Sequence, residues 1–394
     1  MKTSRRLPIT RPHIGPEELE AVQEPLRSGW LVQGPFVAEF ERKFAAFTGA
    51  THALAASSCT TALHLAVAAL GLKPGDEVIV PAFTWVATAN VVEYMGARPV
   101  FCDVELDTYN IDVAAIESKL TPRTVGVIPV HLFGLAADLD PIIDLARARG
   151  LWVLEDAACA LGARYHGRHA GTIGDVGCFS FHPRKSITTG EGGMVTTERD
   201  DLAGLVSSMR DHGASRSDYD RHSASGAHQL ADYDLLGYNY RLTDLQAAVG
   251  SVQMDRAEWI LGERRRCADA YADLLREVPW LGLPVTPDGM EHAYQAYVCL
   301  FRPEEPTMEN VEGLHQRRNA LMAALEEEGI ATRPGTHAAF AQGYYTAKYG
   351  YRPGDFPNAF LADRLSLALP LFADMTDEDL RHVADRLVAH GERA

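Results

Sequence analysis

The feature that most constrains the fold of this chain is a regular alternation of short apolar segments with amphipathic segments between residues 77 and 154. The apolar segments predict strands, and the amphipathic segments predict helices. The predicted strands are 77–81, 99–104, 125–130 and 151–154, and the predicted helices are 86–95, 112–120 and 141–149. This pattern is typical of an α/β fold with a mostly parallel sheet between helices, which binds ligands at the carboxyl ends of its strands.

Other patterns predict the elements outside this alternation and a second, smaller domain. Four phenylalanines at helical spacing over 36–47 indicate an amphipathic helix, and Thr243 and Gln246 form a capping box for a long helix. The other predicted features are a surface loop at 214–233, an end of the long helix near 278, strands near 294–301 and 330–333, a helix near 314–328 and two final helices. We expect a large domain over 1–255 and a smaller α+β domain over 256–394.

Charge and composition restrict the partners and the location of the protein. The 53 acidic and 37 basic side chains give a net charge of −16, which argues against nucleic acid as a main partner. The basic N-terminus has no apolar run after it, and the apolar stretch at 78–92 is too short to span a bilayer. The six cysteines lack the spacing of a zinc site or a disulfide framework. We therefore expect a cytoplasmic protein with free thiols, no metal site and no membrane contact.

Two residues that could take part in catalysis lie at or after the ends of predicted strands. Asp156 ends the apolar strand that begins at Leu151, although it could also cap the next segment or pair with an arginine. Lys185 follows an apolar strand that begins at Cys178 and precedes a loop rich in threonine and glycine. In such surroundings a lysine can form a Schiff base with an aldehyde, provided that its pKa is lowered, whereas an isolated lysine would be a surface charge.

A third element is the run of small polar residues at 57–61, which precedes an amphipathic helix. The free N–H groups and the dipole of a helix N-terminus bind anions, although the same residues could do no more than cap the helix. A lysine, a carboxylate and an anion site together match pyridoxal 5′-phosphate (PLP), which carries an aldehyde, a ring nitrogen and a phosphate. These residues therefore predict a PLP site.

Longer motifs along the chain point to a family. They are SGWLVQGP at 28–35, PGDEVIVP at 74–81, YNID at 109–112, PVHLFG at 129–134, EDAA at 155–158, TTGEGG at 188–193 and GYNYR at 237–241. In this order they resemble the DegT/StrS-type sugar aminotransferases, which are PLP-dependent enzymes of fold type I. The resemblance covers nearly the whole chain and implies a large domain with a mostly parallel sheet and a smaller C-terminal α+β domain.

The resemblance also implies roles for individual residues. Lys185 would bind the cofactor covalently and move the proton, while Asp156 would pair with the ring nitrogen. The other implied cofactor contacts are Cys59, Thr60 and Ser180 at the phosphate, Trp85 over the ring, Cys159 at the ring hydroxyl, and Asn239 from the second subunit of a homodimer. Arg333 and His337 fall where the family contacts its substrate. Three residues depart from the family pattern, namely Cys59 for glycine, Cys159 for glutamine, and Arg184 for a smaller residue.

By the same resemblance, L-glutamate gives its amino group to PLP, leaving pyridoxamine 5′-phosphate (PMP), and a nucleotide-linked keto-deoxysugar accepts it at C4 or C3. An aminotransferase acting on a keto-cyclitol and a non-catalytic PLP-fold regulatory protein are the alternatives. A related dehydratase would have histidine in place of Lys185, and His182 nearby does not substitute for it. An NAD-dependent oxidoreductase is disfavoured because no G-x-G-x-x-G motif follows a strand.

Overall fold

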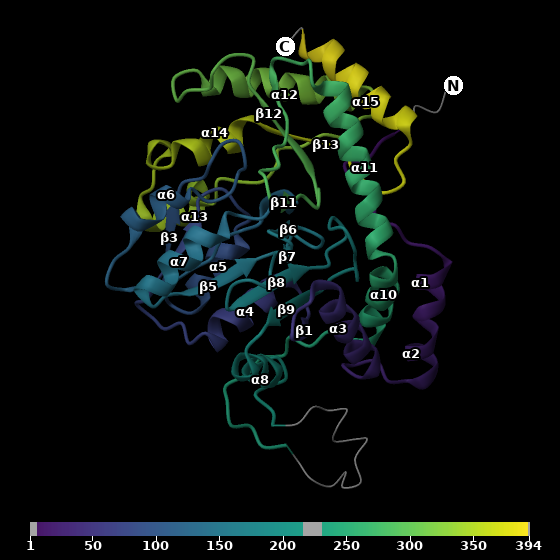
Figure 1. The fold of residues 1–394 in the computed structure, drawn as a ribbon, viewed down its shortest axis with the longest axis vertical. Coiled ribbons are helices and arrows are strands. Elements are labelled where there is room, and N and C mark those ends of the chain that lie inside the picture. Colours follow the sequence, from purple (N-terminus) through teal and green to yellow (C-terminus); the bar gives the residue numbers. More distant parts are fainter. Residues whose placement is uncertain (1–5, 216–230, 393–394) are drawn as a thin grey trace.

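A seven-stranded sheet forms the centre of the molecule in a computed structural model that describes residues 6–215 and 231–392 (Figure 1). The strands lie in the order β1-β9-β8-β5-β4-β2-β3, and only β9 runs antiparallel to its neighbours. Their bounds are β1 His52–Ala56, β2 Glu77–Pro81, β3 Arg98–Cys102, β4 Thr124–Val127, β5 Trp152–Asp156, β8 Val176–Ser180 and β9 Gly193–Thr197. The prediction of an α/β fold with a mostly parallel sheet is confirmed.

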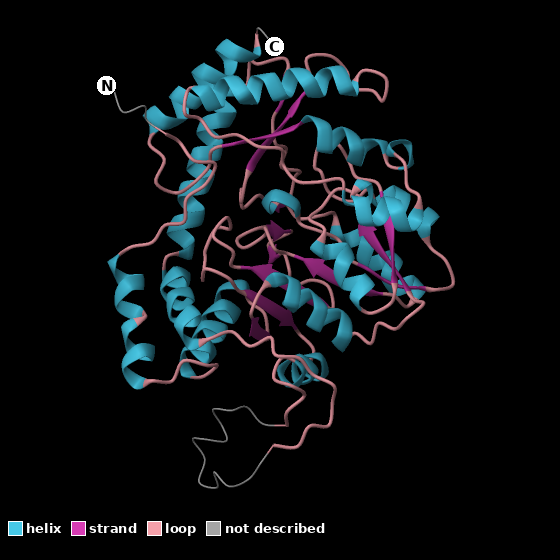
Figure 2. Cartoon of the chain, turned by 180° about the vertical axis from the view of Figure 1, so that it is seen from behind, coloured by secondary structure: helices cyan, strands magenta, loops and turns pink. Residues whose placement is uncertain are grey.

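Helices cover this sheet, as the two opposite views show (Figures 1 and 2). They are α3 Pro35–Thr48, α4 Cys59–Ala69, α5 Ala87–Tyr94, α6 Val113–Ile116, α7 Leu139–Arg149 and α8 Asp200–Met209, while α1 Pro16–Ala21 and α2 Gln23–Ser28 lie beside α10. The helix predicted at 112–120 is shorter than expected, because a 3-10 turn, Glu117–Lys119, follows α6. Pro122 disfavours helical geometry at the residue before it, so the helix cannot continue in this direction.

The predicted capping box forms, with Thr243 Oγ1 accepting from the Gln246 N–H at 3.2 Å and Gln246 Oε1 accepting from the Thr243 N–H at 3.2 Å. It opens α10, Asp244–Asp255, but the long helix predicted here is two helices. The second, α11, spans Ala257–Leu275, and Arg256 between them has φ −104° and ψ −2°. Figure 1 shows α11 leading from the sheet to the C-terminal elements.

The C-terminal part contains a three-stranded antiparallel sheet in the order β10-β12-β13. Its elements are β10 Leu281–Gly282, β12 Tyr297–Phe301, α12 Val311–Glu327, α13 Gly343–Tyr349, α14 Pro357–Leu365, β13 Ser366–Leu369 and α15 Asp377–Gly391. The strand predicted at 330–333 is wrong, since only single bridges join Ile330 to Leu7 and Arg333 to Ala368. Pro334 lacks the N–H that a longer ladder needs. Three helices follow this segment rather than two.

Strand pairing also crosses the predicted domain boundary between 1–255 and 256–394. The division into these two domains stays a prediction. A second small sheet joins β11, Met290–Glu291, to β6, Arg164–Tyr165, which pairs with β7, Arg168–His169. The bridge between Leu7 and Ile330 connects the N-terminal segment to the C-terminal part. The remaining short 3-10 turns are Leu132–Gly134, Ala339–Ala341 and Pro353–Asp355.

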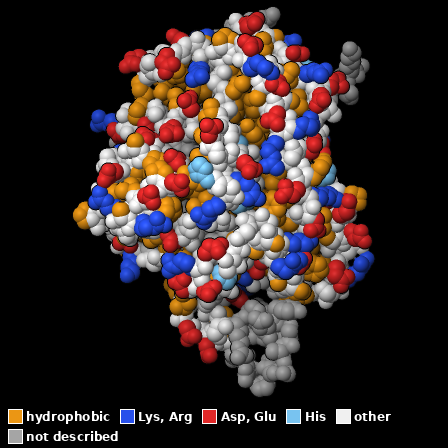
Figure 3. All heavy atoms as spheres, in the orientation of Figure 1, with side chains coloured by type: hydrophobic (Ala, Val, Ile, Leu, Met, Phe, Trp, Pro, Cys, Tyr) orange, Lys and Arg blue, Asp and Glu red, His pale blue; other side chains and the backbone are white. Residues whose placement is uncertain are grey.

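Most of the loop predicted at 214–233 lies outside the described residues, although its ends, Ala214 and Tyr233, form one bridge. Within the described residues, every helix is too short or too polar to cross a bilayer. All six cysteines are free thiols. Figure 3 shows acidic and basic side chains intermixed over the visible face.

Candidate active site

The register of the central sheet brings the predicted cofactor residues to one edge. Asp156 ends β5 and is paired with Cys178 of β8, while Ser180 at the end of β8 is paired with Gly193 of β9. Gly193 is also paired with Ala56, the last residue of β1, so Ser180 lies close to the turn that follows β1. A Cβ atom on Gly193 would collide with the Ser58 carbonyl oxygen, and only glycine permits this close approach.

Asp156 is buried, with 4% of its surface exposed. Its Oδ2 accepts from the Thr88 hydroxyl at 2.7 Å, and its Oδ1 accepts from the Ala158 N–H at 3.2 Å. Burial raises the pKa of Asp156 above its ordinary value, although these hydrogen bonds and the charge of Lys185 oppose the rise. The alternative that Asp156 pairs with an arginine is not supported, since no arginine among the described residues bonds to it.

Lys185 is half-buried, and its Nζ lies 3.0 Å from the Cys159 Sγ. The pocket around it is lined by residues of β8, of the two loops that follow β5 and β8, and by Gln295. Burial lowers the pKa of Lys185, but the Cys159 sulfur and the charge of Asp156 outweigh burial and place the pKa above its ordinary value. The residues around Lys185 therefore do not meet the condition that its surroundings lower its pKa.

The turn after β1 forms an N-terminal cap for α4. Ser58 Oγ accepts from the Thr61 N–H at 3.1 Å, and the Ser58 N–H donates to Thr61 Oγ1 at 2.9 Å. Cys59 and Thr60 are the first two residues of α4, where backbone N–H groups have no partner within the helix. Burial, together with the charge of Asp156, raises the pKa of the Cys59 thiol, which therefore stays neutral. Residues 57–61 therefore cap the helix, and the same turn also offers free N–H groups that could bind an anion.

Trp85 and the predicted substrate residue His337 lie together. Trp85 is 59% exposed, and the centroid of its ring is 5.8 Å from that of His337. The Thr84 N–H donates to the His337 carbonyl at 3.1 Å, and the Ala339 N–H donates to the Ala82 carbonyl at 2.8 Å. The C-terminal segment at 337–339 therefore runs beside the segment that follows β2 and contains Trp85.

Arg333 is half-buried, and no carboxylate among the described residues influences its pKa. Burial lowers the pKa of Arg333, and the charge of Arg184 lowers it further. Asn239 lies apart from the lysine pocket, is exposed, and bridges Asp211 through its backbone. The structure thus gathers Lys185, Asp156, Cys159 and Ser180 and leaves Asn239 on the outer surface.

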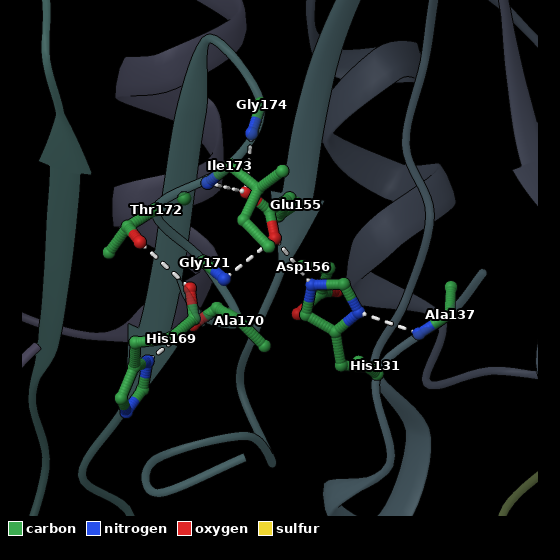
Figure 4. A network of polar contacts seen from close by, with 12 residues as sticks. His131, Ala137, Glu155, Asp156, His169, Ala170, Gly171, Thr172, Ile173 and Gly174 are labelled. Atoms are coloured by element: carbon green, nitrogen blue, oxygen red, sulfur yellow. Dashed lines mark hydrogen bonds and ion pairs between the residues drawn. The ribbon is translucent and has the colours of Figure 1, made fainter. Parts of the chain in front are cut away.

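Sequence reasoning missed a buried network behind Asp156 (Figure 4). The fully buried Glu155 carboxylate accepts from the N–H groups of Gly171, Ile173 and Gly174, each at 2.6 Å. Its Oε2 also lies 2.8 Å from His131 Nε2. His131 Nδ1 accepts from the Ala137 N–H at 3.1 Å, so the proton of a neutral ring is on Nε2 and is donated to Glu155. Strand alternation was the available signal, because it places Glu155 and Asp156 on opposite faces.

These residues fit PLP. The edge of the sheet offers a lysine amine, a buried carboxylate for a ring nitrogen, and a helix N-terminus with Ser180 beside it for a phosphate. Gly193 leaves the backbone cradle open where a larger residue would fill it. Together the fold and the site define the class of the protein, which is that of the PLP-dependent enzymes.

Comparison with known proteins gives the family. Residues 12–388 match the DegT/DnrJ/EryC1/StrS aminotransferase family, and the chain belongs to that family as a PLP-dependent sugar aminotransferase. It is 39% identical over 385 residues to the spore coat polysaccharide biosynthesis protein SpsC of Bacillus subtilis, covering 98% of this chain and 97% of SpsC.

Solved structures agree with this assignment. The aminotransferase TlmJ from Streptoalloteichus hindustanus has a TM-score of 0.87 and 32% identity, with 98% of each chain covered. The PMP form of Spr1654 from Streptococcus pneumoniae has a TM-score of 0.90 and 27% identity, with 98% of this chain and 99% of that chain covered. Both the fold type and the dependence on PLP are thereby confirmed.

Proposed function

We propose that the enzyme transfers an amino group from L-glutamate to a nucleotide-linked keto-deoxysugar, at C4 or C3 of the sugar. The observation that carries this proposal is the positive charge of Arg184 and Arg333. No acidic group among the described residues influences the pKa of Arg333, whereas the charge of Arg184 does, although the chain carries a net charge of −16. Two such guanidiniums favour a substrate with anionic groups, which a nucleotide diphosphate supplies and a keto-cyclitol lacks.

The proposed roles of the site residues follow from their positions. PLP supplies an aldehyde that binds amines covalently and a ring that accepts electrons from the reacting carbon. Lys185 Nζ would hold the cofactor and then move the proton to and from the amino-acid α-carbon. Asp156 would pair with the ring nitrogen, and its carboxylate would keep a proton on that atom.

The other proposed contacts are Cys59, Thr60 and Ser180 at the phosphate, Cys159 at the ring hydroxyl and Trp85 over the ring. Arg333 and His337 would contact the acceptor substrate. The relationship to SpsC, named for polysaccharide biosynthesis, supports a sugar acceptor.

The acceptor is tested with purified enzyme, PLP and L-glutamate against a panel of nucleotide-linked 4-keto and 3-keto deoxysugars and keto-cyclitols. We expect release of 2-oxoglutarate with a nucleotide sugar, and a higher KM for that substrate in Arg333→Ala. The exposed Arg381→Ala on α15 is the matched control. Turnover with keto-cyclitols alone, or an Arg333→Ala variant with an unchanged KM, would contradict the proposal.

We also propose a homodimer with shared active sites. Asn239 is exposed, and Leu236 nearby is 86% exposed, as expected for a segment that a second subunit covers. Mixed dimers of Lys185→Ala and Asn239→Ala chains would contain one site with both residues intact. Recovery of activity on mixing supports the shared site, whereas an active monomer would refute it. The cytoplasmic location stays a prediction.

A further inference from the structure

The C-terminal part of the chain inserts one sharp corner, residues 293–296, beside the lysine pocket. The Ala293 N–H donates to the Gly134 carbonyl at 2.8 Å. Gly134 has φ 103°, and a Cβ at this position would lie 3.0 Å from the backbone nitrogens of Tyr294 and Gln295. The corner therefore packs against the 3-10 turn Leu132–Gly134 at a distance that only glycine permits.

The corner is held in a strained conformation. Tyr294 has φ 46°, which is uncommon for a residue with a bulky side chain. The buried guanidinium of Arg264 on α11 donates to the carbonyl oxygens of Tyr294, Gln295 and Leu371, at 3.3, 3.1 and 3.4 Å. Burial lowers the pKa of Arg264 to about 10, so it still carries its proton at neutral pH. These bonds fix the backbone from which the Gln295 side chain extends.

Gln295 lines the same pocket as Lys185, and its Nε2 donates to the Arg184 carbonyl oxygen at 2.7 Å. That oxygen belongs to the peptide group that joins Arg184 to Lys185. On the other side of this peptide group, the Lys185 N–H donates to the His182 carbonyl at 2.8 Å. The peptide group that carries the lysine is thus held at both of its polar atoms.

We propose that Gln295 is a positioning residue, which orients the Arg184–Lys185 peptide and thereby aims the Lys185 amine at the reacting carbon. The inference rests on the proposed role of Lys185. It adds a residue from outside the predicted 1–255 domain to the reactive half of the site. A small displacement of a catalytic group lowers the reaction rate strongly. The loss of this hydrogen bond should therefore slow the proton transfer while the stability of the protein changes little.

The test compares Gln295→Met, which keeps the length of the side chain but has no donor, with Gln295→Asn, which keeps a shorter amide. The control is Gln316→Ala, an exposed position on α12. Single-turnover rates with L-glutamate would be measured on PLP-loaded enzyme, together with the pH midpoint of the absorption band of the lysine-bound cofactor. Hydrogen exchange of residues 182–187 would be measured on cofactor-free protein.

We expect Gln295→Met to react about tenfold more slowly, with a shifted pH midpoint, faster exchange in 182–187 and an unchanged melting temperature. Gln295→Asn should lie between it and the wild type. A Met variant with the wild-type rate, midpoint and exchange would overturn the inference while leaving the proposed function intact. A slower rate that only parallels a lower melting temperature would also overturn it. A wild type without lysine-bound cofactor would overturn both.

Discussion

Two neighbouring carboxylates on β5 differ in almost every physical respect. Glu155 is fully buried, faces away from the lysine pocket, and accepts hydrogen bonds from three backbone N–H groups and His131. Asp156 is buried on the opposite face and accepts from one hydroxyl and one N–H. Although burial raises the pKa of Glu155, its hydrogen bonds, above all that from His131, lower it overall, whereas burial dominates at Asp156 and raises the pKa.

The difference separates a structural charge from a reactive one. The Glu155 network holds the turn at 171–174 that precedes β8, and therefore supports the strand that leads to Ser180 and Lys185. Each carboxylate oxygen of Asp156 accepts one hydrogen bond from the protein, which leaves lone pairs that can accept a further bond from a bound group.

Glu155→Gln should lower the free energy of unfolding by about 3–5 kcal/mol. An amide has only one acceptor oxygen and no charge, so some of the four buried donors around residue 155 would lose their hydrogen-bond acceptor. Chemical denaturation of the cofactor-free protein measures the loss. Glu117→Gln, which breaks the exposed ion pair with Arg149, serves as the control and should cost no more than about 1 kcal/mol. Equal losses in the two variants would remove the structural role of Glu155.

Asp156→Asn should reduce kcat by about 10²–10³-fold while the free energy of unfolding changes little or rises, because the variant removes a poorly solvated charge that stabilises the reacting state. Release of 2-oxoglutarate gives kcat, with the exposed Asp144→Asn on α7 as control. The comparison fails if Asp156→Asn retains normal kcat or is as unstable as Glu155→Gln.

Thr88→Val keeps the size of the side chain but removes the hydroxyl that donates to Asp156 Oδ2 at 2.7 Å. We expect a fall in kcat of about tenfold, since a hydrogen bond to a charged group is worth about 1.5–3 kcal/mol at most and water can replace part of it. Steady-state kinetics measure the change. An effect as large as that of Asp156→Asn would show that Thr88 does more than orient the carboxylate.

The two carboxylates should also change stability with pH in opposite directions in the cofactor-free protein. A lowered pKa stabilises the fold above the unfolded value of about 4.3, so the Glu155 contribution is lost as the pH falls through its folded pKa. A raised pKa stabilises the protonated fold, so the Asp156 contribution is lost as the pH rises from about 3.9 through its folded pKa. Unfolding of the wild type, Glu155→Gln and Asp156→Asn between pH 3 and 7 measures both slopes. Slopes of the same sign would refute the assignment of the two environments.

The sequence predicted those parts of the fold that follow local patterns. Strand–helix alternation located β2 to β5 because burial repeats regularly there, and Asp156 stood out as a carboxylate at a strand end. The break at Arg256 depends on tertiary packing, which periodicity does not record. The segment at 330–333 forms only single bridges, and Pro334 is the local signal in the sequence that argued against a strand there.

Residues at the ends of strands could be proposed for the site from the sequence, and their roles stay predictions. Gln295 could not be proposed, because it lies in a corner with one left-handed residue and no pattern of residue types marks such a corner. Asn239 lies outside the lysine pocket of its own chain, which agrees with the prediction that it contributes to a second subunit but does not test it.

The most direct test of the account is an absorption spectrum of the PLP-loaded wild type and of Lys185→Ala, before and after addition of L-glutamate. We expect a band of lysine-bound cofactor in the wild type that glutamate converts to the pyridoxamine form, and no such band or turnover in the variant. Normal turnover by Lys185→Ala, or a wild-type protein that never forms the lysine-bound band, would contradict it.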